Sequence, residues 1–207
     1  MSVRVVNLGL PKTGTTTLAR AMRRAGMKSA DHRIKPHQTE DDSLHNVFVA
    51  DLLYKGFFET GDPLHHLHEF GALTEVSLLR QGRSVWPQMD FSLLRAIRTH
   101  HPDVRFLASN RDAFSLSQSM LAWSDLGASR LPNSAVPGLP QGYGETTKER
   151  MQWIEGHYAT LRQIFKGDAQ FMEYDIADTN IRKRLTDFLG IDVPWWGRTN
   201  RNRMSQV

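Results

Sequence analysis

The chain has 207 residues, of which 40% are hydrophobic and 23% charged, and it carries a formal net charge of +4. This length suits a single domain with its own core, and the composition excludes a wholly disordered chain. The chain contains no cysteine, which excludes disulfides, thiolate metal ligands and cysteine nucleophiles.

The predicted elements begin with a strand over residues 3–8, a short apolar run that ends before Gly9. A helix follows from Thr16, because apolar residues recur there at helical spacing, and Gly26 ends it. The later predicted elements are helices over 42–55 (stopped by Gly56), 63–70 and 91–98, a strand over 104–109, a helix through Met120, an irregular loop over 127–144, a helix over 146–165, a strand over 169–174 and a helix over 180–189.

This alternation of strands and helices is typical of an α/β fold with a parallel central sheet. We predict a single domain over residues 1–207, with a P-loop-like three-layer fold in which helices flank the central sheet on both faces. No apolar stretch reaches the ~18 to 20 residues that span a bilayer, and the first strand is too short and polar for a signal peptide. A cytoplasmic protein is therefore expected.

Gly9 and Gly14 are separated by four residues, between the first strand and the first helix, as in a phosphate-binding P-loop. Glycine lets backbone N–H groups approach an anion closely, and a helix start favours negative charge. The loop therefore predicts a site for a phosphate-like dianion. Hydroxyl donors in the same segment come from Thr13, Thr15, Thr16 and Thr17.

The position of the lysine differs from that in a nucleoside-triphosphate P-loop. There, a lysine follows the second glycine directly, and the next Ser or Thr holds magnesium. Here Thr15 has that position, and the lysine comes earlier, as Lys12. The strand over 104–109 leads into Asn110 and Arg111 and not into an aspartate. The pattern favours a dianion handled without a metal, while a nucleotide kinase or hydrolase and a non-catalytic nucleotide-binding module stay as alternatives.

The segment Pro11-Lys12-Thr13-Gly14-Thr15-Thr16-Thr17-Leu18 resembles the 5′-phosphosulfate loop of sulfotransferases that use 3′-phosphoadenosine 5′-phosphosulfate (PAPS). The resemblance implies a second element, a strand followed by Arg and, eight positions later, by Ser, which together grip the 3′-phosphate. Arg111 and Ser119 have this spacing after the strand over 104–109, and the spacing favours Ser119 over the nearby Ser115 and Ser117. Family members also cover the 3′-phosphate with a basic C-terminal loop, which makes Arg198 and Arg201 candidates.

The resemblance implies that a sulfuryl group leaves PAPS, with 3′-phosphoadenosine 5′-phosphate (PAP) as the second product. Lys12 would neutralise the oxygen that departs with the 5′-phosphate, and the segment from Pro11 to Thr17 would bind the phosphosulfate. A general base must take the proton of the acceptor. Some family members use a glutamate in the stretch that holds Glu75, so Glu75 is the predicted base and His32 the second candidate.

The nine histidines do not match metal-binding spacings, so no metal site is expected. The basic residues form no long unbroken run, so nucleic acid is not an expected partner. The acceptor is an unidentified compound with a hydroxyl or amine, and we expect the loop over 127–144 and the segment around Trp86 to surround it.

Overall fold

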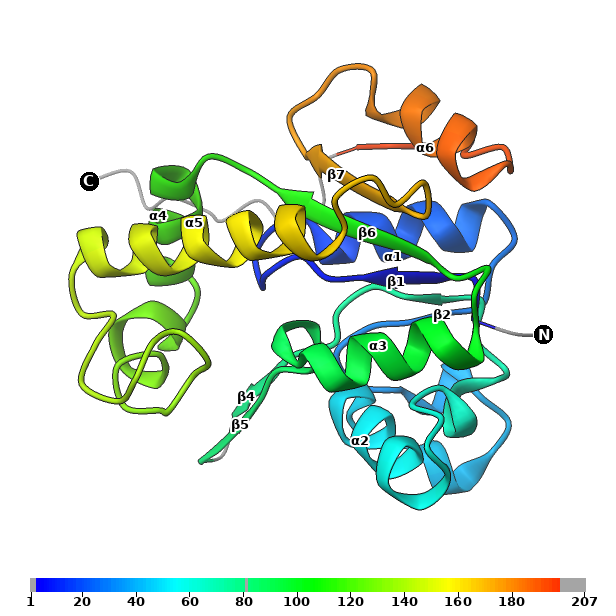
Figure 1. Ribbon diagram of the computed structural model, residues 1–207, viewed down its shortest axis with the longest axis horizontal. Helices are drawn as coiled ribbons and strands as arrows, with labels where there is room; N and C mark the ends of the chain where they lie inside the picture. Colours follow the sequence, from blue (N-terminus) through cyan, green and yellow to red (C-terminus); the bar gives the residue numbers. More distant parts are fainter. Residues whose placement is uncertain (1–2, 81, 198–207) are drawn as a thin grey trace.

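A computed structural model describes residues 3–80 and 82–197 of the chain (Figure 1). Its centre is a five-stranded sheet with the strand order β2-β3-β1-β6-β7, and every pair of neighbours is parallel. The α/β class and the central parallel sheet are thereby confirmed. The strands are β1 (Val5–Asn7), β2 (Ser29–Ala30), β3 (Ala72–Leu73), β6 (Arg105–Asn110) and β7 (Phe171–Asp175).

Helices cover both faces of this sheet, because alternate side chains of a strand point to opposite sides. Val5 and Leu107 pack in one apolar cluster with α1 and α6, whereas Val6 and Phe106 pack in a second cluster with α3 and α5. Figure 1 shows α3 and α5 in front of the sheet and α1 behind it. The helices are α1 (Thr15–Arg24), α2 (Val49–Thr60), α3 (Phe91–His100), α4 (Ala113–Leu121), α5 (Thr147–Ile164) and α6 (Ile181–Leu189).

Two sheet strands and a hairpin were missing from the sequence prediction. β2 and β3 have two residues each and are fully buried, so they carry neither the length nor the alternation by which a strand is recognised. The hairpin pairs β4 (Leu78–Arg80) with β5 (Arg83–Val85) in antiparallel register. It follows β3 directly and lies outside the main sheet.

The predicted helix over 42–55 is wrong at both ends. The chain forms only a short 3₁₀ turn at Asp42–Leu44, and Asn46 then adopts a left-handed φ of 63°, which no α-helix accommodates. The helix α2 begins at Val49 and continues past Gly56. A Cβ on Gly56 would lie 2.5 Å from the Asp62 carbonyl oxygen, so this glycine allows close packing of the following turn.

Two other segments are less regular than a helix. The predicted helix over 63–70 is reduced to a 3₁₀ turn at His65–Leu67. The predicted loop over 127–144 is irregular except for a π-helical turn at Leu126–Arg130 and one isolated bridge. Among the described residues, no helix is both long and apolar enough to cross a membrane.

Candidate active site

The segments that follow the parallel strands meet at one edge of the sheet, where all the carboxyl ends of the strands lie. From the central strand β1 the chain continues to β2 and β3 on one side, and later to β6 and β7 on the other. Ligands of open parallel sheets bind at such a reversal of strand order, outside the carboxyl ends. The Gly9–Thr17 loop follows β1, and Arg111 follows the adjacent strand β6. Both predicted motifs therefore lie at the reversal.

The Gly9–Thr17 loop turns sharply into α1. Lys12 has φ 73° and Gly14 has φ 80°, so both adopt the left-handed conformation that is uncommon for a residue with a side chain. Gly14 precedes the first residue of α1, and no side chain caps this helix start in the described structure. The first turn of α1 contains no acidic residue of its own, so the positive end of its dipole faces the loop.

Asn7, the last residue of β1, connects three strands at this edge. Its Nδ2 donates to the Thr74 carbonyl oxygen and to the Ser109 Oγ, each at 3.0 Å. Its Oδ1 accepts from the Ser109 N–H at 3.0 Å and from the Gly9 N–H at 3.3 Å. A buried amide with this many partners fixes the start of the loop relative to β3 and β6.

Thr13 and Tyr158 fix the middle of the loop. The Thr13 hydroxyl is buried, donates to the Leu10 carbonyl oxygen at 2.6 Å and lies 2.8 Å from the Ser109 Oγ. The Tyr158 hydroxyl, from α5, accepts from the Leu10 N–H at 3.2 Å and donates to the Ser109 carbonyl oxygen at 2.7 Å. The Thr13 hydroxyl is thus bonded within the protein, where it supports the loop.

Gly9 is the point of closest approach between the loop and β6. A Cβ on Gly9 would lie 2.5 Å from the Ser109 carbonyl oxygen, closer still to its Oγ, and 2.9 Å from the Thr13 Oγ1. These neighbours are backbone or are held in the network described above, so they cannot move aside independently.

We therefore expect Gly9→Ala to lower the free energy of unfolding by about 1 to 3 kcal/mol, as overpacking of a buried site does. Urea denaturation measures this change. Gly156→Ala is the matched control, since a Cβ at this helical glycine meets no atom within 4 Å and should raise stability by up to about 1 kcal/mol. Equal stability of Gly9→Ala and wild type would contradict the close approach.

Lys12 lies at the centre of the site. Its Nζ is 3.6 Å from the ring centroid of Trp123, which follows α4 and is 44% exposed. Burial, the largest cause, and the positive charge of Arg111 lower the pKa of Lys12, the negative charge of Glu75 opposes them, and the net result is a pKa of about 8. Arg111 and Glu75, which are far from Lys12 in the sequence, therefore lie close enough to it to influence its charge.

Glu75 lies two residues beyond β3 and is only 9% exposed. Burial raises its pKa to about 7. The Ser77 hydroxyl, which donates to Oε1 at 2.6 Å, and the Thr15 hydroxyl both favour the charged form, whereas the charge of Asp31 disfavours it. A carboxylate with a pKa near neutrality beside the first turn of α1 has the proton affinity that general base catalysis requires.

Arg111 lies directly after β6, partly exposed, and its guanidinium makes no salt bridge within the described part of the chain. The neighbouring carboxylate of Asp112 instead caps α4, accepting from the Ser115 N–H at 2.8 Å. Ser119 is partly exposed and lies about two turns along the same helix. The Arg111 guanidinium is therefore available for an anion.

The remaining predicted site residues differ in how far they are buried. Pro11 and Thr16 are partly exposed and Thr17 is buried, whereas Arg198 and Arg201 lie outside the described residues. His32 Nδ1 is 2.9 Å from the Ser77 carbonyl oxygen, and burial lowers the pKa of the ring. His32 therefore lies close to the Glu75 segment and is mostly neutral at pH 7.

Sequence reasoning did not identify four residues of the site: Asn7, Asp31, Trp123 and Tyr158. Asn7 carried a signal, because an amide inside an otherwise apolar strand needs partners. Asp31 and Trp123 carried none, since only the fold brings the end of β2 and the turn after α4 to the same edge as the loop.

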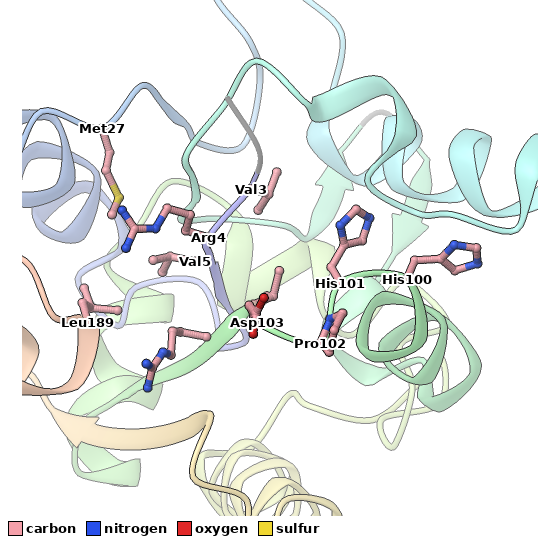
Figure 2. A pocket seen from close by; sticks show the side chains of 11 residues that line it. Val3, Arg4, Val5, Met27, His100, His101, Pro102, Asp103 and Leu189 are labelled. Carbon is pink, nitrogen blue, oxygen red and sulfur yellow. The ribbon is translucent and has the colours of Figure 1, made fainter.

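A pocket of about 520 Å³ lies at the opposite edge of the sheet, around the amino ends of β1 and β6 (Figure 2). Figure 2 shows the Arg4 side chain extending toward Met27, while the rings of His100 and His101 lie on the other side of the pocket. The His101 ring is bonded to Asp62 at 2.8 Å. His101 therefore already has a carboxylate partner, Asp62, which does not line this pocket. No group of three His, Asp or Glu residues in the described ranges could hold a metal ion.

Comparison with known proteins found no protein-family model and no curated protein that matches this chain.

Proposed function

We propose that this protein is a sulfotransferase that uses PAPS, with the P-loop-like form of the α/β fold. The observation that carries this proposal is the convergence of Lys12, Arg111 and Glu75 at the carboxyl ends of adjacent strands, around an open helix start. Two cations and a helix dipole suit a ligand with two anionic groups, and a carboxylate with a pKa near neutrality suits deprotonation of an acceptor.

The binding roles follow the two motifs. The segment from Pro11 to Thr17 would hold the 5′-phosphosulfate, with Lys12 and the α1 N-terminus supplying positive charge. Arg111 would bind the 3′-phosphate through its fork of N–H donors, with Ser119 adding a hydroxyl. Arg198 and Arg201 would complete this second phosphate site.

The reaction then needs one proton transfer and one bond exchange. The acceptor oxygen or nitrogen forms a bond to sulfur, while the bond between sulfur and the bridging oxygen breaks and its electron pair stays on the 5′-phosphate of PAP. Glu75 takes the acceptor proton. Lys12 donates a hydrogen bond to the departing oxygen, where negative charge develops.

Binding of PAP tests this proposal without knowledge of the acceptor. We expect PAP without magnesium to stabilise the protein against heat, by about 2.7 kcal/mol when its concentration is 100 times the dissociation constant. Arg111→Ala should weaken PAP binding by about tenfold or more, because it removes charge-assisted hydrogen bonds to phosphate. Differential scanning calorimetry and isothermal titration measure these changes.

Arg182→Ala is the control, since this exposed arginine of α6 carries the same charge outside the site. It should bind PAP as the wild type does. Stabilisation by ATP with magnesium and none by PAP would instead favour the nucleotide kinase or hydrolase. Binding of PAP without transfer from PAPS to any acceptor would favour the non-catalytic module.

A further inference from the structure

A second pocket, of about 580 Å³, lies between α5 and the start of α3, and we name it the α5 pocket. Its lining is mainly apolar, and the irregular segment after Leu131 closes one side. The apolar lining residues are Met89, Leu94, Pro137, Leu139, Pro140, Tyr143, Trp153, Leu161 and Ile164. A concave, mostly apolar pocket of this size is typical of small-molecule sites.

Gln88 is the unusual member of this lining. Its side chain is only 1% exposed, and neither Nε2 nor Oε1 has a hydrogen-bond partner among the described residues. Each such unpaired polar group costs about 1 to 3 kcal/mol. The amide offers both a donor and an acceptor, and a ligand would reach them when the side chain turns into the pocket.

The α5 pocket differs in charge from the Gly9–Thr17 loop, because no lysine or arginine from the described part of the chain lines it. Among the described lining residues, Glu149 and His157 are the ones with a carboxyl or imidazole group. The Glu149 carboxylate already accepts from the Gly144 and Thr146 N–H groups, at 3.1 and 3.0 Å. Burial lowers the pKa of His157 to about 4, so its ring is neutral at pH 7. The pocket therefore suits a neutral ligand and not an anion.

We propose that the α5 pocket binds a neutral, mainly apolar small molecule that carries a carboxamide, paired with the amide of Gln88. A carboxamide has a donor and an acceptor side by side, so it can satisfy both unpaired atoms of Gln88 at once. The Tyr143 ring and the Ile164 side chain line the pocket and are exposed, so the apolar part of a ligand can cover them. This binding would occur whether or not the protein transfers sulfuryl groups.

Two amides and their hydrocarbon analogues are the probes: benzamide with isopropylbenzene, and 2-naphthamide with 2-isopropylnaphthalene. Ligand-detected NMR gives their affinities. We expect wild type to bind at least one amide about tenfold or more tightly than its hydrocarbon analogue, the effect of one or two net hydrogen bonds. Gln88→Met should remove this preference, keep binding of the hydrocarbon and raise thermal stability.

Gly156→Phe tests the location. Gly156 lines the pocket and a Cβ there meets no atom within 4 Å, so the ring can enter the pocket without a backbone clash. This variant should lose binding of all four probes, whereas Ala159→Phe, at an exposed position of α5 outside the lining, should not. Equal affinity of wild type for amides and hydrocarbons, no amide binding, or amide binding that survives Gly156→Phe would each overturn the proposal.

Discussion

Glu75→Gln is expected to lower the rate of sulfuryl transfer by about 10²- to 10⁴-fold, the usual contribution of a general base. Glutamine keeps the size of the side chain and can still accept from the Ser77 hydroxyl, but it cannot take a proton from the acceptor. The affinity for PAP should be unchanged or higher, because a negative charge near Lys12 is removed. Single-turnover transfer from radiolabelled PAPS, with an acceptor found by screening phenols, alcohols and amines, measures the rate.

Glu155→Gln is the matched control, since Glu155 is exposed on α5 and should keep full activity. A rate for Glu75→Gln within about twofold of wild type would show that another group is the base. His32→Gln is then the next variant to measure, because this ring contacts the same segment through the Ser77 carbonyl oxygen.

Glu75 also predicts a pH dependence of stability that needs no acceptor. Its pKa in the folded protein, about 7, lies above its ordinary value of 4.5, so the folded state holds this proton more tightly than the unfolded state. The stability from this proton is fully present below about pH 4.5 and is lost as pH rises through 7, by on the order of 3 kcal/mol. Urea denaturation should show this loss in wild type and not in Glu75→Gln.

The two motifs could be predicted from the sequence because each depends on local order. A strand, a glycine loop and a helix are consecutive in the chain, so Gly9 to Thr17 is found by its pattern. Arg111 is found by the spacing of Arg and Ser that the resemblance implies after the strand predicted over 104–109, which the structure has as β6. Each element is long or distinct enough for its period to be recognised. The predicted α/β sheet follows from the same alternation.

The contacts that hold these motifs in place could not be predicted, because they join segments that are distant in the sequence. β3 has two residues, so nothing in the sequence shows that Glu75 follows a sheet strand beside β1. Trp123 reaches Lys12 only through the packing of α4, and the hydroxyl of Thr13 turns to Ser109, far along the chain. Pattern therefore identifies which residues can bind an anion, and packing decides which side chains are free to do so.

Lys12→Met should lower the transfer rate by about 10²- to 10³-fold, the usual effect of removing one donor to a developing oxyanion. The wild type should show a bell-shaped dependence of kcat/KM on pH, because activity needs Glu75 deprotonated and Lys12 protonated. The acidic limb then reflects the Glu75 pKa of about 7, and the alkaline limb reflects the Lys12 pKa of about 8. Together these two pKa values predict a narrow pH optimum of kcat/KM.

Lys12→Arg separates the charge of Lys12 from its titration. Arginine stays protonated throughout the accessible pH range, so the alkaline limb should disappear while the acidic limb keeps its position. Lys166→Met, at an exposed lysine after α5, should leave both limbs unchanged. Persistence of the alkaline limb in Lys12→Arg would assign it to another group. If Lys12→Met also kept the wild-type rate, the left-handed backbone of Lys12 would serve the shape of the loop, and the charge of its side chain would have no part in the departure of the phosphate.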